Sequence, residues 1–92
     1  MDNECYLEMV EPDNNHFKFW KAELQGNQIV REWGRIGETR QRKVDLFNNA
    51  VEARNFFVSK QNEKLNKGYK RTQESIHKKD IMLSKLIRKL NQ

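Results

Sequence analysis

Three short turn sequences divide the first half of the chain, and they strongly restrict how it can fold. Each is rich in Gly, Pro, Asn or Asp, residues that favour tight turns; they are Glu11–Asn15, Gln25–Asn27 and Gly37–Thr39. The segments between them are candidate strands, over residues 6–10, 16–24, 28–36 and 40–47. Links this short join antiparallel neighbours, so the sequence predicts a four-stranded antiparallel meander with one face covered.

After residue 48 the spacing of apolar residues changes to that of a helix. Asn49 is followed three residues later by a glutamate, the arrangement of a capping box, and Gly68 stands where a left-handed C-terminal cap is needed. We expect a helix over about 49–67. It would cover the sheet with Ala53 and with either Phe56 or Phe57.

A second helical pattern covers residues 73–90. Its apolar residues recur at seven-residue intervals, with Lys and Arg opposite; they are Ile76, Leu83 and Leu90, with Leu86 and Ile87 between. Such a stripe has to be buried against something. The expected architecture is α+β, with a sheet-and-helix domain over residues 1–70 and a basic amphipathic C-terminal helix over 71–92.

Length and charge limit the classes of function. A chain of 92 residues is too short for an enzyme with a separate cofactor-binding domain. The net charge is +5, and it is unevenly distributed: residues 1–59 hold 8 basic and 10 acidic groups, whereas residues 60–92 hold 10 and 3. This asymmetry indicates either a polyanionic partner or a basic, solvated tail. The single cysteine, the absence of a long apolar run and the acidic N-terminus predict a cytoplasmic protein without a membrane span.

The third predicted strand carries the most informative residues. Because side chains alternate along a strand, Arg31, Trp33 and Arg35 share one face, and Val30 and Ile36 share the other. We expect the aliphatic pair to face the core. The indole is then either presented to a phosphate-bearing ligand between two guanidinium groups, or it caps the sheet while the arginines cover its ring. Alternation alone leaves both arrangements open.

The run Trp33-Gly34-Arg35, followed by Ile36-Gly37, resembles the signature of the WGR domain, which occurs in DNA-dependent poly(ADP-ribose) polymerases and in small bacterial proteins. The resemblance extends over residues 6–70. It includes further positions that match the family pattern in order: Lys18-Phe19-Trp20, Gln41, Phe47, Ala53, Phe56, Lys64 and Gly68-Tyr69. Two positions depart from the pattern, because Phe17 stands where the family often has Asn, and Arg40 stands where it has Gly.

The resemblance implies an antiparallel sheet with one helix across it, and binding to DNA breaks or ends. It implies that Trp33 packs on a terminal sugar near a 5′ phosphate. It also implies one of two roles for Arg35, contact with the ligand or a bridge to a neighbouring domain.

The predicted nucleic-acid-binding residues combine the signature with nearby cations and one tyrosine: Trp33, Arg35, Arg31, Arg40, Arg42, Lys18 and Tyr69. Arg40 and Arg42 share one face of the fourth strand, where adjacent-strand placement would bring one of them near Arg35. The alternative for this strand is a charged edge that prevents aggregation. Tyr69 lies either at the binding face or over the core.

Other chemistries find no support in the sequence. His16, His77 and Cys5 lack the spacing of metal ligands, the serines lack a matched base, and there is no glycine-rich phosphate loop. We therefore expect no catalytic residues, no metal and no cofactor. The predicted function is a non-catalytic module that binds nucleic acid, with DNA favoured over RNA and with the nucleoid as one expected location. The alternative is a protein–protein adaptor or assembly module that uses the WGR face and the C-terminal helix, with a protein partner or a second copy bound through residues 73–90.

Overall fold

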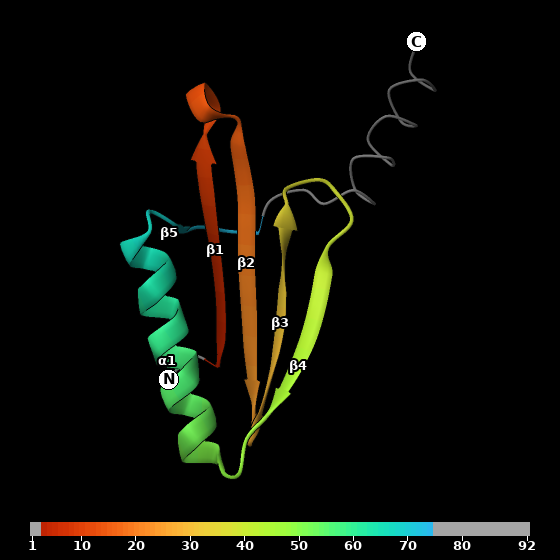
Figure 1. Ribbon diagram of the computed structural model, residues 1–92, viewed down its shortest axis with the longest axis vertical. Helices are drawn as coiled ribbons and strands as arrows, with labels where there is room; N and C mark the ends of the chain where they lie inside the picture. The colour runs from red at the N-terminus through yellow and green to blue at the C-terminus, as the bar shows by residue number, and fades with distance from the viewer. Residues whose placement is uncertain (1–2, 75–92) are drawn as a thin grey trace.

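The computed structural model describes residues 3–74, which form one antiparallel sheet and one long helix (Figure 1). The first four strands are β1 (Glu4–Glu11), β2 (His16–Gln25), β3 (Gln28–Arg35) and β4 (Gln41–Leu46), with a 3-10 turn, η1 (Pro12–Asn14), between β1 and β2. Helix α1 (Ala50–Asn66) and a two-residue strand, β5 (Lys70–Arg71), follow. The order of strands in the sheet is β4-β3-β2-β1-β5.

The structure confirms the α+β class, the antiparallel meander and the helix, but the predicted number of strands was wrong. The fifth strand, β5, pairs with β1 through Leu7 opposite Arg71 and Glu8 opposite Lys70. Two residues are too few to show an alternating pattern, so this strand could not be predicted from the sequence. The predicted helix over 73–90 lies almost wholly outside the described residues, and the division of the chain into 1–70 and 71–92 stays a prediction.

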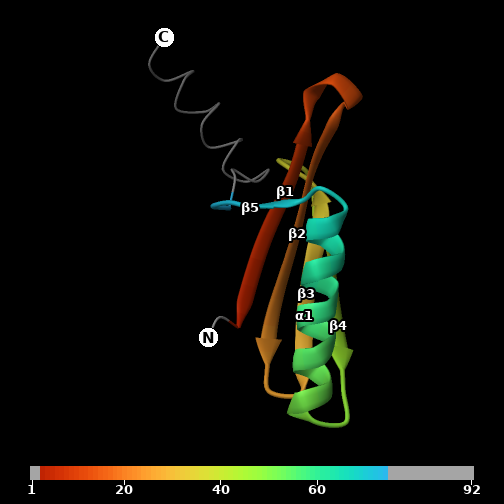
Figure 2. The same ribbon diagram turned by 90° about the vertical axis from the view of Figure 1, so that its left-hand side faces the viewer.

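Helix α1 lies along one face of the sheet, and β5 leads the chain past the β1 edge (Figure 2). The N-terminus of α1 is capped as expected, because Asn49 Oδ1 accepts a hydrogen bond from the Glu52 backbone N–H at 2.9 Å. The capping box is displaced by one residue, since the Glu52 carboxylate accepts from the backbone N–H of Asn48 rather than that of Asn49. Ala53 and Phe57 are buried against the sheet, and Phe56 is half-buried.

The C-terminal end of α1 forms a Schellman motif around Gly68. The Gly68 N–H donates to the carbonyl of Leu65 and the Tyr69 N–H donates to the carbonyl of Lys64, both at 3.1 Å. Gly68 has φ +107, a conformation that L-residues with side chains rarely adopt. The motif turns the chain back sharply and places Tyr69 beside the Lys64 side chain, with the ammonium 5.3 Å from the centre of the phenol ring.

The core lies between α1 and the sheet, and this corrects the expected facing of β3. Val30 is only half-buried and pairs with the exposed Val44, on the face opposite the helix, while Ile36 lies beyond the end of β3. Ile29, on the α1 face, is fully buried instead. The neighbouring strand β2 determines which face of β3 is buried, because the side of β2 that faces α1 is strongly apolar. The core cluster consists of Cys5, Leu7, Trp20, Ala22, Leu24, Ile29, Ala53 and Phe57.

We refer to the sheet surface opposite α1 as the open face. Phe19 lies on this face and yet is only 1% exposed. The Tyr6 ring stacks against it, with centroids 6.0 Å apart, and the Arg40 guanidinium lies 5.1 Å from its ring centre. The part of the open face around Phe19 is therefore covered by polar side chains of the protein itself.

Candidate nucleic-acid interface

A small cleft lies between the C-terminal end of α1, the start of β2 and the end of β3. Figure 1 shows where these ends of the elements lie. The volume of the cleft is about 290 Å³. Three elements form its walls: the start of β2, the end of β3, and the last turn of α1 with the Schellman motif that follows it. The lining residues are Lys18, Phe19, Trp33, Gly34, Arg35, Lys64 and Tyr69.

The cleft is positively charged, because three cationic side chains and no carboxylate line it. Lys18 and Arg35 are exposed, whereas Lys64 is half-buried. Burial lowers the pKa of Lys64 below the ordinary 10.5, and the positive charges of Lys67, Lys60 and Arg31 contribute in the same direction. Burial also raises the pKa of the Tyr69 phenol above 10.0, so this group stays protonated at neutral pH. Such a cleft suits an anionic ligand with an apolar surface.

Trp33 combines the two arrangements that the sequence left open. Its ring is half-buried and packs against the core cluster, and it also lines the cleft. Arg31 partly covers the ring, with its guanidinium carbon 5.6 Å from the ring centre. The same guanidinium donates to Asp45 through Nε at 2.6 Å, so Arg31 is held as a neighbour of Trp33 rather than as a free phosphate ligand.

Arg35 is held at the rim of the cleft by the turn between β1 and β2. Its guanidinium donates to the backbone oxygen of Asn15 at 3.2 Å and to Asn15 Oδ1 at 3.1 Å. The carbon of the group also lies 5.0 Å from the Phe17 ring centre. Asn15 has φ +55, a conformation that asparagine tolerates better than most residues. These contacts orient the guanidinium while leaving the residue exposed.

Gly34, the central residue of the signature, has φ +150, which is uncommon for L-residues with side chains. A Cβ placed there would lie 3.6 Å from the Cα of Arg40 and 3.8 Å from the Phe19 ring, which are ordinary contact distances. The backbone conformation therefore favours glycine here more than the available space does.

The structure does not bring Arg40 and Arg42 to the cleft. The backbone of Arg40 returns beside Gly34, but its guanidinium binds the Glu32 carboxylate on the open face. Arg42 also lies on that face, 3.8 Å from Glu32. The expected approach of one of these side chains to Arg35 is thus replaced by ion pairing with Glu32. Four of the seven predicted binding residues do line the cleft: Trp33, Arg35, Lys18 and Tyr69.

Two residues of this region were absent from the predicted binding set. Lys64 lines the cleft, and its place five residues before Tyr69 across the Gly68 cap was the signal for it, because a Schellman motif brings these two positions together. Asn15, which holds Arg35, gave no signal, since its contact depends on the conformation of the β1–β2 turn.

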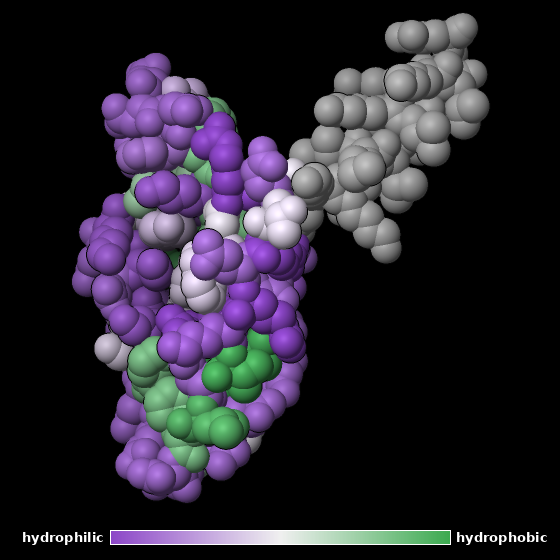
Figure 3. All heavy atoms as spheres, turned by 45° about the vertical axis from the view of Figure 1, so that its right-hand side comes forward, coloured by the Kyte–Doolittle hydropathy of each residue, from purple (hydrophilic) through white to green (hydrophobic). Residues whose placement is uncertain are grey.

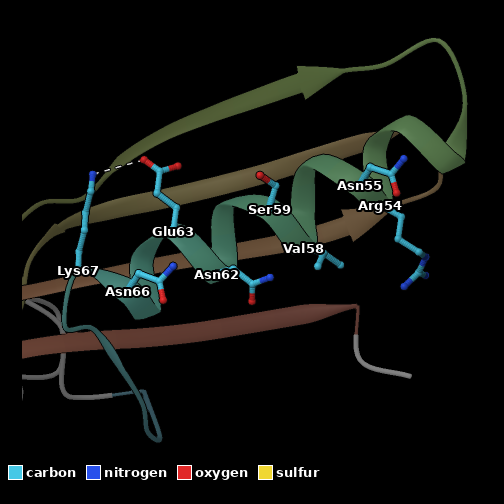
Figure 4. Close-up of a pocket in the computed structure, with 8 residues that line it drawn as sticks. All are labelled: Arg54, Asn55, Val58, Ser59, Asn62, Glu63, Asn66 and Lys67. Atoms are coloured by element: carbon cyan, nitrogen blue, oxygen red, sulfur yellow. Dashed lines mark ion pairs between the residues drawn. The ribbon is translucent and has the colours of Figure 1, made fainter.

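A larger hollow, of about 860 Å³, lies along the outer side of α1 and is lined by residues of that helix and by its C-cap residue, Lys67 (Figure 4). Half of its eight lining residues are uncharged and polar, and none of the eight is aromatic. Its one carboxylate, Glu63, pairs with Lys67 at 3.4 Å and with Lys60 at 3.1 Å. This surface lacks the combination of aromatic ring and unpaired cations found in the cleft.

The family model for the WGR domain matches residues 3–76, which cover the sheet, α1 and the cleft. The chain belongs to the WGR domain family. WGR domains are generally nucleic-acid-binding, non-catalytic modules. The signature of the family corresponds to Trp33, Gly34 and Arg35, and all three residues line the cleft.

The WGR fold is also found in a solved structure, the crystal structure of a protein from Bacteroides fragilis. The two chains are 27% identical and superpose with a TM-score of 0.72 over 77% of this chain. The present chain spans only 20% of the length of the Bacteroides protein. None of the curated proteins compared with the chain matches it.

Residues 3–74 contain no group of three or more His, Cys, Asp or Glu side chains that could hold a metal ion. No helix in this part of the chain has the length and apolar character needed to cross a bilayer. The expectations of a cofactor-free protein and of a cytoplasmic location stay predictions.

Proposed function

We propose that this WGR domain is a non-catalytic module that binds duplex DNA at ends or breaks, with the strand terminus seated in the cleft. The observation that supports the proposal is the cleft itself, in which a half-buried indole adjoins three cationic side chains and no carboxylate. A terminal nucleotide offers both a phosphate and a sugar face that no neighbouring nucleotide covers. A small, partly recessed site of this kind favours an end over the continuous backbone of a duplex.

In the proposed complex, Arg35, Lys18 and Lys64 contact phosphate oxygens, and the Trp33 ring packs on the terminal sugar. Arginine suits phosphate because its planar group donates two parallel hydrogen bonds, while the lysines act as point charges. Tyr69 completes the wall beside Lys64. Arg31 supports the indole from its other side through its ion pair with Asp45.

Fluorescence anisotropy of a labelled duplex over a salt series tests the proposal. We expect binding to the 5′-phosphorylated end to exceed binding to the 5′-hydroxyl end. For about three phosphate contacts, a log–log plot of affinity against salt should have a slope of roughly −3. A dumbbell duplex of the same sequence, closed by hairpins at both ends, is the matched control. Equal affinity for the open and closed duplexes would contradict end recognition, and a flat salt series would contradict phosphate binding.

The lowered pKa of Lys64 predicts a pH dependence of binding. Only the protonated ammonium attracts phosphate, so affinity should fall as the pH rises through the pKa of Lys64, below the range where an ordinary lysine loses its charge. Lys64→Arg should remove this loss, because a guanidinium stays protonated. Anisotropy titrations of both proteins from neutral pH to pH 10 check the prediction. Parallel profiles for the two proteins would show that Lys64 does not contact the ligand.

The alternative function is a protein adaptor or assembly module that uses the WGR face and the predicted helix over 73–90. Nearly all of that predicted helix lies outside the described part of the chain. It stays a prediction. Sizing by light scattering, with and without DNA, distinguishes a self-associating protein from a monomeric DNA-binding module.

A further inference from the structure

The outer edge of β4 has no neighbouring strand among residues 3–74. β4 is the last strand at one end of the sheet, whereas at the other end β5 covers part of the β1 edge. The pairing of β4 with β3 runs without interruption from Gln28 opposite Leu46 to Trp33 opposite Gln41. Bulges and prolines often prevent an edge strand from pairing with another chain, and β4 has neither. Its outer edge can therefore accept a further strand.

The hydrogen bond of Phe47 shows which backbone groups face outward along this edge. The Phe47 N–H donates to the carbonyl of Asn27 at 2.8 Å, in line with the pairing of β3 and β4. Hydrogen-bonded residues alternate along an antiparallel pair, so the odd-numbered residues of β4 bond to β3. The N–H and C=O groups of Arg42, Val44 and Leu46 consequently point away from β3, toward the outer edge.

The side chains of β4 are apolar on one face and oppositely charged on the other. On the open face, Val44 is 42% exposed and lies opposite the half-buried Val30, and Leu46 is 74% exposed. On the α1 face, Lys43 Nζ lies 3.8 Å from Asp45 Oδ1. Figure 3 shows that apolar residues gather at the end of the molecule where β4 leads into α1, whereas the rest of the visible surface is mostly hydrophilic. This apolar surface reaches the edge of the sheet, where a further strand would extend it.

A second copy of β4 satisfies both faces in one antiparallel register. In a dimer with two-fold symmetry, each such register has one residue that faces its own copy. When that residue is Val44, the two valines meet on the open face, and Lys43 lies opposite Asp45 of the second copy on the α1 face. Registers centred on Arg42, Lys43 or Asp45 would bring identical charges face to face, which is unfavourable. The charges of this edge therefore disfavour the other registers and select this one.

We propose that the chain forms a two-fold symmetric dimer in which β4 pairs antiparallel with β4 of a second copy, with Val44 at the axis. The two Val44 residues exchange backbone hydrogen bonds, and Arg42 does so with Leu46 of the other copy. On the open face, the Val30 and Val44 side chains of both copies form one continuous apolar row. On the α1 face, Lys43 and Asp45 of both copies form a symmetric group of alternating charges.

The dimer would place both clefts on the same side of the joined sheet. A two-fold axis perpendicular to the sheet keeps each face on its own side, so both α1 helices lie on one face and the apolar row lies on the other. With DNA ends as ligands, one dimer would hold two ends on one face. This consequence rests on the proposed function, whereas the pairing of β4 does not. The dimer is therefore tested without DNA.

Disulfide crosslinking of the full chain tests the register. In the proposed dimer, the Cα atoms of the two copies of residue 44 lie about 5.5 Å apart, within the range that a disulfide spans. Val44→Cys should therefore give a covalent dimer when copper phenanthroline and dissolved oxygen oxidise the thiols. Leu46→Cys is the matched control, because position 46 is more exposed but lies about 14 Å along the strand from its own copy. The unaltered protein, whose Cys5 is buried, is the blank. Crosslinking of Leu46→Cys as fast as that of Val44→Cys would overturn the proposal.

Sedimentation equilibrium measures the same interface without a covalent bond. An interface formed mainly by two short strands is small beside the about 1,200 Å² of most stable complexes, so we expect a Kd in the micromolar to millimolar range. Val44→Lys brings two ammonium groups together at the axis and should raise the Kd roughly tenfold or more. Val51→Lys, at an exposed position of α1, should leave it unchanged. Thermal unfolding shows whether each variant is folded.

Two results of this measurement would contradict the dimer. The first is a monomer at every concentration up to about 1 mM, the upper end of the expected range. The second is a dimer that Val44→Lys leaves intact, which would assign the association to a surface other than β4.

Discussion

Replacing Trp33 with alanine is expected to weaken binding to a 5′-phosphorylated duplex end by roughly 5- to 150-fold, the range that corresponds to the about 1–3 kcal/mol an aromatic side chain contributes per stacked nucleotide. The ring lines the cleft and adjoins the three cations that would hold the phosphate. Anisotropy titration at fixed salt measures the effect. Trp33→Phe retains an aromatic surface and should recover part of the affinity.

Trp33 also packs against the core cluster, so the loss of affinity has to be separated from a loss of folding. Circular dichroism melting shows whether the alanine variant stays folded at the assay temperature. Trp20 provides an internal comparison, since it is only 3% exposed while Trp33 lines the cleft. In a Trp20→Phe protein, DNA should change the emission of Trp33. Unchanged emission, with full affinity in Trp33→Ala, would remove the indole from the binding site.

Replacing Phe57 with alanine is expected to lower the free energy of unfolding by about 3–5 kcal/mol, the usual cost of removing a buried aromatic ring. Phe57 is 4% exposed and is one of the two α1 residues in the core cluster. A small domain has about 5–15 kcal/mol of stability, so this change removes a large part of it. Urea unfolding followed by circular dichroism measures the difference.

Val58→Ala is the matched control for Phe57→Ala. It is the next residue of α1, but its side chain is 46% exposed. Removing exposed methyl groups from a helix should change the free energy of unfolding by less than about 0.5 kcal/mol. If both variants unfolded at the same urea concentration, the helix would not be anchored to the sheet through Phe57.

Features that depend on neighbouring residues in the sequence could be predicted well. The turn residues fixed the four long strands to within about two residues of their observed ends. The Asn49 cap and the Gly68 cap defined α1 at both ends. These signals are local hydrogen bonds and backbone preferences, and they do not require knowledge of the rest of the fold.

The choice of the buried face of β3 could not be made from β3 alone. Its alternation placed aliphatic residues on both sides, and the expectation that Val30 faces the core was wrong. The packing of α1 on Trp20, Ala22 and Leu24 selects the face that carries Ile29 and Trp33. A single strand with apolar residues on both sides does not contain this information.

The positions of the charged residues near the cleft also depend on neighbouring strands and could not be predicted from one strand alone. The sequence predicted a shared location for Arg35, Arg40 and Arg42, because it places them on adjacent strands. The structure shows that Glu32 engages Arg40 and Arg42 on the other face of the sheet. Which cations remain available to a ligand depends on where the carboxylates lie. That arrangement follows from cross-strand register, as with Glu32 opposite Arg42.

The contact between Arg35 and Asn15 makes the length of a surface turn matter for ligand recognition. Turns between strands ordinarily tolerate insertions and deletions, because few other groups depend on them. Here both oxygens that hold the guanidinium belong to the last residue before β2. Relatives in which this turn is longer or shorter would need a different anchor for their signature arginine, and the proposed function then predicts a different preference among DNA termini.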